Sequence, residues 1–470
     1  MLTDKQLHFQ FPTRHKPGKN GTSAGYRLPG WLLVLTCLAI ATACRQGVVH
    51  TVVIDPGHGG VQKSTPDDKW DPIQKRYLGS YLSGMSTEVN GKRVYEHIEV
   101  LKLARRLHVW LELTHTDQGW REFLALLKKF SDQKSFQRIY FDSSLTRTDS
   151  WLDHELDADD PDVNAPYRLY DYPDSKSGQM QPGRISRINQ LEPELIVSLH
   201  NNPAGSGHSG GMAAVLAPAW GTFALIRKID EGQEPEIRFL RTPWAQTWLI
   251  TDPGWSVFQA ARADTWVYFH GYRTTADGSP DRSKNRGIRQ NMVQWSYADK
   301  PGWEAKYNPD QRGPYAIRHA DFQASGPFFD RERSRFESWR RSGGPLGYGG
   351  DNHYASDELM RFAQYGFRTL AKELRTDGAI GPINPPYTST YSLPTFSNAI
   401  VAYLEIAYLN RKRDRQLMTA YREELAQSLA VGIYSLFAGL ELKPRAWPFV
   451  PDGSAINFEK YGRYFRDVSE

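Results

Sequence analysis

The stretch Val48-Val-His-Thr-Val-Val-Ile-Asp-Pro-Gly-His-Gly-Gly60 decides the first element of the fold. Nearly every residue up to Ile54 is β-branched, which predicts a buried strand. Proline and glycine then interrupt the pattern, which predicts a tight turn directly after the strand. A histidine, His58, stands in this turn. The stretch therefore places a histidine at the carboxyl end of the first predicted strand.

Two further strands are predicted, and each also stops at a polar residue. Leu195–Leu199 is an apolar run that stops at His200, and Asn398–Leu404 is one that stops at Glu405. Apolar residues recur at helical spacing elsewhere: Val100, Leu101, Ala104, Leu107 and Leu111, and again Leu417, Tyr421, Leu425, Leu429, Ile433 and Phe437. The first set predicts a helix that begins near Glu96, and the second predicts one long helix that closes the fold.

Strands that alternate with helices predict an α/β fold. The expected architecture is a single open, twisted and mostly parallel sheet flanked by helices, in one domain over residues 45–470. Residues 204–393 differ from the rest of the chain in composition and pattern: Gly, Pro and Trp are frequent, and the hydrophobic periodicity is weak. We expect them to form a long, loop-rich insertion before the last strand, with its tryptophans mainly in its own core. The insertion's histidines have no paired ligand spacing and are not expected to bind metal: His208, His270, His319 and His353.

The composition is that of a folded soluble protein and excludes several kinds of site. Of 470 residues, 40% are hydrophobic and 24% charged, and the formal net charge is +5. This charge is too small to indicate nucleic-acid binding, although it would favour an anionic polymer of the cell envelope. The two cysteines, Cys37 and Cys44, both lie in the N-terminal segment, so a disulfide framework and a cysteine zinc site are excluded in the rest of the chain. Any metal ion must be held by His, Asp or Glu.

Residues 1–44 are typical of a signal segment. Basic residues precede the apolar run Trp31–Ala43, which is shorter than the roughly 20 residues that cross a bilayer. This arrangement predicts export from the cytoplasm. Ala41-Thr-Ala43 directly before Cys44 resembles a bacterial lipoprotein processing site, which would make Cys44 a lipid anchor and the protein's only contact with the membrane. Ordinary cleavage near the same place is the alternative.

Four residues combine into one candidate site: His58, Glu96, His200 and Glu405. Three of them follow or end strands, and the carboxyl ends of strands line the ligand crevice of an open α/β sheet. Two histidines and a carboxylate are a common ligand set of catalytic zinc, which leaves one position open for water. A second carboxylate can take a proton from this water and pass it to a leaving nitrogen. Each residue taken singly has an ordinary structural explanation, so the hypothesis rests on the set.

Five short motifs surround these residues in a fixed order. They are Ile54–Gly60, Glu96 with Leu101 and Ala104-Arg-Arg-Leu107 behind it, Leu145-Thr-Arg-Thr-Asp149, Val197–Asn201 and Tyr403–Asn410. Together they resemble the zinc-dependent N-acetylmuramoyl-L-alanine amidases, a family that includes the periplasmic cell-division amidases. The resemblance covers residues 48–203 and 394–438.

The resemblance implies that His58, Glu96 and His200 bind one zinc ion and that Glu405 is the catalytic carboxylate. It implies hydrolysis of the amide bond between N-acetylmuramic acid and L-alanine of the peptidoglycan stem peptide, in the bacterial envelope and most simply in the periplasm. In the cell-division members, an inserted helix covers the zinc cleft until a partner protein displaces it. Residues 204–393 are a candidate for that role by position, with an activator protein as a candidate partner.

Two neighbours of Glu96 are less suitable as ligands. Glu99 lies almost on the same helix face as Glu96, but the family's spacing to the following Leu and Ala-Arg-Arg-Leu fits only Glu96. His97 would point about 100° away from Glu96. The chain also departs from the family pattern twice. Val61-Gln-Lys63 stands where the family usually has an Asp, so the hydrogen bonding expected behind His58 differs from that of the family. Asn201-Asn-Pro203 follows the third ligand where the family usually continues with Ala, which would change the shape of the substrate groove.

Two other functions stay open at this point. A non-catalytic wall-binding or regulatory protein would keep the same scaffold, but such relatives normally lose a ligand or the catalytic glutamate, and all four residues are present here. A zinc amidohydrolase that acts on another envelope amide would use the same ligand set.

Overall fold

The computed structural model describes residues 48–59, 70–71, 76–77, 84–150, 166, 172–173, 180–181, 184–202, 210–218, 220–248, 256–262, 348–375, 380–389, 393–394 and 397–461. Several predicted features lie outside these residues: the N-terminal segment with Cys37 and Cys44, the stretch Val61-Gln-Lys63, Pro203, and the histidines His208, His270 and His319. What the sequence indicates about them stays a prediction.

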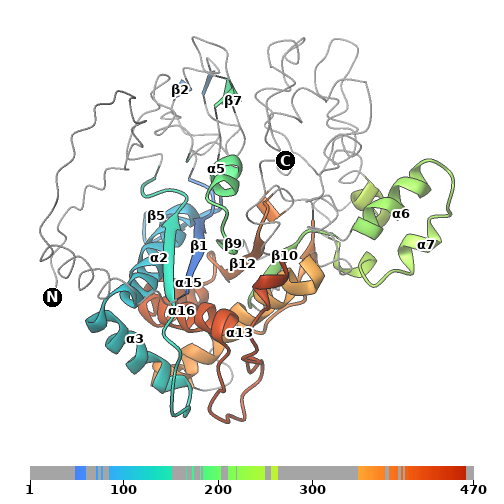
Figure 1. Ribbon diagram of the computed structural model, residues 1–470. Coiled ribbons are helices and arrows are strands. Elements are labelled where there is room, and N and C mark those ends of the chain that lie inside the picture. The colour runs from blue at the N-terminus through green and yellow to red at the C-terminus, as the bar shows by residue number, and fades with distance from the viewer. Residues whose placement is uncertain are drawn as a thin grey trace, which may run out of the picture. The chain divides into compact units, whose positions relative to one another are not determined.

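A six-stranded sheet forms the centre of the fold (Figure 1). Its strand order is β11-β10-β12-β9-β1-β6. The strands are β1 (Val49–Pro56), β6 (Tyr140–Leu145), β9 (Leu195–Asn202), β10 (Ala213–Leu216), β11 (Tyr387–Thr388) and β12 (Ile400–Tyr408). β6, β1, β9 and β12 run parallel, and β10 is antiparallel to β12. The expected mostly parallel α/β sheet is confirmed.

The central strands are buried on both faces, as is usual in a parallel sheet covered by helices. Every residue of β12 is buried, and so is β9 up to Asn201. In β1, the run Val52–Ile54 is fully buried. Because β1, β9 and β12 are parallel, their carboxyl ends lie at the same edge of the sheet. This edge is where the predicted site residues come together.

Three helices pack beside one another and form one hydrophobic core with the sheet. They are α2 (Glu96–Glu112), α16 (Arg422–Ala438) and α13 (Asp351–Leu370). α2 contacts β1, β6 and β9, α13 contacts β10 and β12, and α16 contacts both α2 and α13. α13 and α16 approach so closely that a Cβ at Gly366 would lie 1.7 Å from Ser428 Oγ. This helix pair therefore needs glycine at that position.

Shorter elements complete the described part of the fold. They are α3 (Asp117–Phe130), α5 (Arg184–Gln190), α6 (Trp220–Asp230), α7 (Ile237–Leu240), α15 (Lys412–Thr419), and the two-stranded pairs β2 (Trp70–Asp71) with β3 (Arg76–Tyr77), β4 (Ser86–Val89) with β5 (Lys92–Tyr95), and β7 (Tyr172–Pro173) with β8 (Met180–Gln181). Among the helices that the structure describes, none has both the length and the apolar character needed to cross a membrane.

The prediction of one long closing helix over 417–437 is wrong. α15 ends at Thr419 and α16 begins at Arg422. The break allows α15 to pack on β12 while α16 packs between α2 and α13. Apolar residues keep their helical spacing through both helices, so the spacing alone did not reveal the break.

The stretch 204–393 contributes to the main sheet. Both β10 and β11 lie within it, and α13 belongs to the main core. Around α6 and α7 the chain builds a second, smaller core, whose members are Ile226, Phe239, Ala245, Trp248, Phe258, Ala260 and Ala261. The described part of the stretch therefore divides between the sheet and this second core.

Candidate metal centre

His58 lies in the turn that follows β1, in a left-handed backbone conformation with φ of 61°. The first residue of the turn is still bonded to the sheet: Gly57 N donates a hydrogen bond to Leu199 O of β9 (3.0 Å). A Cβ at Gly57 would lie 2.2 Å from Cε1 of His200, so only glycine leaves room for that ring. A non-glycine residue in this conformation costs about 1–3 kcal/mol and persists only where its surroundings enforce it.

Glu96 is the first residue of α2 and is 2% exposed. Its Oε1 accepts a hydrogen bond from Asn201 N (2.8 Å), and its Oε2 accepts one from Met85 N (2.7 Å). The backbone before β4 packs directly on the carboxylate, because a Cβ at Gly84 would lie 2.6 Å from Oε2. Two backbone amides from separate segments thus fix the orientation of this side chain.

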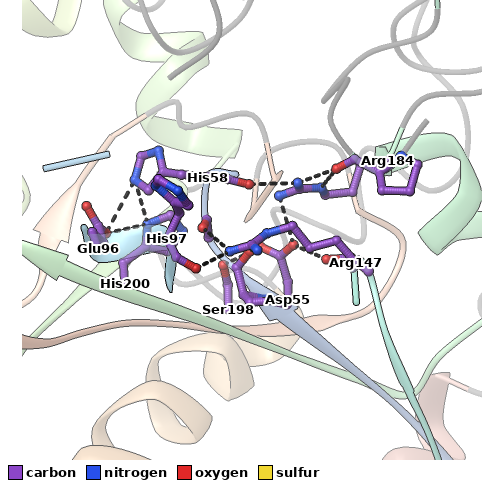
Figure 2. A network of polar contacts seen from close by, with 12 residues as sticks. Asp55, His58, Glu96, His97, Arg147, Arg184, Ser198 and His200 are labelled. Atoms are coloured by element: carbon purple, nitrogen blue, oxygen red, sulfur yellow. Dashed lines mark hydrogen bonds and ion pairs between the residues drawn. The ribbon is translucent and has the colours of Figure 1, made fainter. Parts of the chain in front are cut away.

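Donor atoms of His58, His200 and Glu96 converge on one point (Figure 2). His200 Nδ1 lies 3.1 Å from His58 Nε2, and each of these nitrogens lies 3.3 Å from Glu96 Oε1. Ligand atoms at 2.0–2.1 Å from a tetrahedral zinc ion lie roughly 3.3–3.4 Å apart, so the three distances fit a single ion. Among the residues that the structure describes, this is the one group of three or more His, Cys, Asp or Glu side chains with such spacing.

The protonation states in the cluster suit a cation. Burial alone would raise the pKa of Glu96, but the nearby rings of His58 and His200 lower it overall, so the group is a carboxylate. Burial lowers the pKa of His200, and the neighbouring His58 lowers it further, against the opposite effect of Glu96. A neutral His200 has one ring nitrogen free to act as a ligand.

Glu405 of β12 lies beside His200 and Glu96. It pairs with His200 across the β9–β12 ladder, and the register shifts immediately afterwards, between Glu405 and Ala407. Such bulges are frequent next to active sites, where they change the direction of a side chain. Burial raises the pKa of Glu405 well above its usual range, and the charge of Glu96 adds to this effect. Its Oε2 is buried and has no hydrogen-bond partner within the described part of the chain. A carboxyl group with a raised pKa is a candidate for general acid–base chemistry.

Other residues contact this cluster without having been predicted to do so. The ring of Tyr403 stacks on His200, with 4.3 Å between the ring centroids. Asp55, Arg147 and Arg184 form a buried polar network that contacts the turn of His58 (Figure 2). Asp55 and Arg147 stand inside two of the motifs quoted from the sequence, but nothing in those motifs indicated what they contact.

The rejected neighbours of Glu96 have other contacts. Glu99 accepts a hydrogen bond from Lys102 Nζ (2.8 Å) and pairs with Arg422 of α16. His97 packs against Tyr95, with 5.3 Å between the ring centroids. His353 lies on α13 and belongs to no metal-type group among the described residues.

Comparison with known proteins gives structural neighbours only. No family model matches the sequence, and no curated protein matches it either. An N-acetylmuramoyl-L-alanine amidase from Clostridium difficile 630 is 13% identical and has a TM-score of 0.29, with 82% of this chain and 96% of that chain covered. The catalytic domain of CwlV, an amidase from Bacillus (Paenibacillus) polymyxa, is 12% identical and has a TM-score of 0.27, with 82% of this chain and 96% of that chain covered. The amidase Ami1 from Mycobacterium smegmatis is 11% identical and has a TM-score of 0.32, with 83% of this chain and 97% of that chain covered. These three solved structures are N-acetylmuramoyl-L-alanine amidases, and the activity of this chain is inferred from its own site.

Proposed function

We propose that this protein is a zinc-dependent N-acetylmuramoyl-L-alanine amidase, which hydrolyses the bond between N-acetylmuramic acid and the L-alanine of the stem peptide. The observation that carries the proposal is the convergence of His58, Glu96 and His200 at zinc-ligand spacing beside Glu405. These residues come from four separate segments of the chain. The motifs that surround them in the sequence support the choice of substrate.

The roles of the residues follow from their surroundings. A zinc ion held by His58, Glu96 and His200 would polarise the scissile carbonyl and lower the pKa of a coordinated water. Glu405 takes a proton from the attacking water and delivers it to the leaving nitrogen of L-alanine. Its burial beside Glu96 favours the protonated form, which it needs for the second of these steps. The products are free stem peptide and glycan without peptide.

The cellular setting is part of the proposal. Residues 1–44 direct the protein out of the cytoplasm, and Cys44 carries a lipid that anchors it in the envelope. Part of the stretch 204–393 controls access to the site, with an activator protein as its partner. N-terminal analysis and mass spectrometry of the exported protein would show whether Cys44 is lipidated.

The direct test uses purified mature protein and isolated peptidoglycan, with mass spectrometry of the released fragments. Free stem peptides are expected, and a chelator should abolish their release until zinc is added back. Glu405→Ala should still bind the wall and zinc but should lose about 10²–10⁴-fold in rate, the usual contribution of a general acid–base group.

Other outcomes would identify the competing functions. Fragments that still join peptide to sugar would contradict amidase action. Binding of the wall without any release, in the wild type as in Glu405→Ala, would favour a non-catalytic wall-binding protein. Zinc-dependent hydrolysis of a different envelope amide would keep the metal chemistry and replace the substrate.

A further inference from the structure

The backbone of the turn that carries His58 is held by side chains from outside the turn. Arg147 Nε donates to Pro56 O and Arg147 Nη2 donates to Gly57 O, both at 3.0 Å. Arg184 Nη2 donates to His58 O at 2.8 Å (Figure 2). Three consecutive carbonyl groups thus accept hydrogen bonds from two guanidinium groups. These bonds satisfy carbonyls that the left-handed turn removes from the sheet ladder.

Arg147 also connects the turn to α2. It is 1% exposed, and its Nη2 donates to His97 O (2.7 Å), one residue after the ligand Glu96. The turn is shaped around this side chain, because a Cβ at Gly59 would lie 2.9 Å from Arg147 Nε. A single rigid guanidinium group therefore fixes the position of the His58 turn relative to Glu96.

Arg184 connects the same turn to β9. Its Nη1 lies 3.3 Å from Asp55 Oδ1, in a buried ion pair. Asp55 Oδ2 accepts a hydrogen bond from Ser198 Oγ (2.8 Å), and its Oδ1 accepts one from Thr146 Oγ1 (2.7 Å). Ser198 precedes the ligand His200 by two residues on the same strand. The second guanidinium group thus links the His58 turn to the strand that supplies the other histidine.

From these contacts we propose that Arg147 and Arg184 are positioning residues of the metal centre. They hold the Pro56–His58 backbone, which ends in the left-handed His58, so that His58 Nε2 faces His200 and Glu96 before a metal ion binds. Neither arginine touches the metal or the substrate in this assignment. The inference rests on the proposed zinc site.

The test compares zinc binding by the full mature chain and its variants Arg147→Lys and Arg184→Lys. Lysine keeps the charge but cannot reproduce the planar, multiple donation. Each variant should bind zinc about 10–100-fold more weakly, the usual effect of losing a residue that orients a metal ligand. The matched control is Arg368→Lys, which alters a buried arginine of α13 that pairs with Gln364. Zinc affinity is measured by competition with a chromophoric chelator, and thermal unfolding of the metal-free proteins gives their stability.

A second readout separates positioning from a general loss of stability. Cobalt(II) replaces zinc in the same proteins, and its visible absorption reports the geometry of the ligands. The bands should shift or weaken in Arg147→Lys and Arg184→Lys and stay unchanged in Arg368→Lys. Where a lysine variant does not fold, Ser198→Ala takes its place. It leaves both arginines intact, removes the hydrogen bond from Ser198 Oγ to Asp55 Oδ2, and should weaken zinc binding by a factor near the lower end of the same range.

The outcomes distinguish this inference from the proposed function. Wild-type affinity and wild-type cobalt spectra in the arginine variants, or in Ser198→Ala where it replaces them, would overturn the positioning role alone. The same loss of affinity in Arg368→Lys would also overturn it. A wild-type chain that binds no zinc, and does not differ from His58→Ala, would overturn the zinc site and this inference together.

Discussion

Two histidine–glutamate clusters occupy opposite ends of the same pair of strands, β1 and β9. At the amino end, His50 Nδ1 lies 2.9 Å from Glu194 Oε2. At the carboxyl end, His58 and His200 face Glu96. The side chains of the first pair are 15% and 25% exposed, whereas those of His200 and Glu96 are 7% and 2% exposed. The residue types are the same, but His200 and Glu96 are buried, whereas the third member of the second cluster, His58, is 17% exposed.

The two clusters also differ in how their atoms are used. In the first, one histidine nitrogen and one carboxylate oxygen bond directly to each other, and Thr51 N shares that oxygen (3.2 Å). In the second, three donor atoms stand 3.1–3.3 Å apart around a common point. Separate backbone amides hold the carboxylate of Glu96. The second cluster thus differs from the first in having a third converging donor atom and a carboxylate held by two backbone amides.

The largest difference between the two ends is expected in metal binding. His200→Ala should weaken zinc affinity by more than the roughly 10–100-fold that follows the loss of a supporting residue, and peptidoglycan hydrolysis should stop. His50→Ala should leave zinc affinity unchanged, because His50 lies at the opposite end of the strands, where its Nδ1 is bonded to Glu194. Chelator competition measures both. Equal losses in the two variants would show that the contrast between the clusters is wrong.

Asp55, at the carboxyl end of β1, should make the stability of the folded protein sensitive to acid. Burial alone would raise its pKa, but Arg184, Thr146, His200 and Ser198 lower it overall from 3.8. The ionised form therefore stabilises the folded state: this contribution is complete above pH 3.8 and disappears as pH falls through the lower, folded-state pKa.

Asp55→Asn should accordingly lower the free energy of unfolding by about 3–5 kcal/mol at pH 7, because it leaves Arg184 buried without its partner. The difference from wild type should shrink below pH 3.8. Urea unfolding between pH 3 and pH 7 measures it. A difference that stays constant over this range would mean that folding does not lower the pKa of Asp55.

Gly57→Ala tests the close packing of the site. Its Cβ would displace the ring of His200, which should destabilise the protein by about 1–3 kcal/mol and weaken zinc binding. Gly221→Ala on α6 is the matched control, because nothing lies within 4 Å of its Cβ. That variant should gain about 0.5–1 kcal/mol from helix propensity. Thermal unfolding of both variants distinguishes crowding at the site from a general effect of adding a methyl group.

The smallest effect is expected at the amino end. Glu194→Gln should change the free energy of unfolding by only about 0–1 kcal/mol, as is usual for a partly exposed ion pair, and should not alter zinc affinity. A loss of several kcal/mol, measured by urea unfolding, would mean that this cluster stabilises the sheet much as the buried network does at the other end.

Much of the fold could be predicted because it depends on local patterns. The β-branched run before Asp55 and the apolar runs before His200 and Glu405 became β1, β9 and β12. The break between α15 and α16 escaped prediction, because both helices present apolar residues at the same spacing. β11 has only two residues and no pattern of its own, so its place in the sheet depends on tertiary contacts, namely its pairing with β10 and the bridge from Trp248 to Thr388.

The sequence by itself determined which residue types stand at the ends of the strands. Since parallel strands end at one edge of a sheet, this was enough to bring His58, His200 and Glu405 together. Only the tertiary structure decided the spacing of the donor atoms, the burial that raises the pKa of Glu405, and the hold of Arg147 and Arg184 on the His58 turn. The reason is clearest for the two arginines, because each joins its side chain to a backbone carbonyl far away in the sequence, 91 positions for Arg147 and 126 for Arg184. A carbonyl group is present in every residue, so such a contact leaves no mark in the sequence.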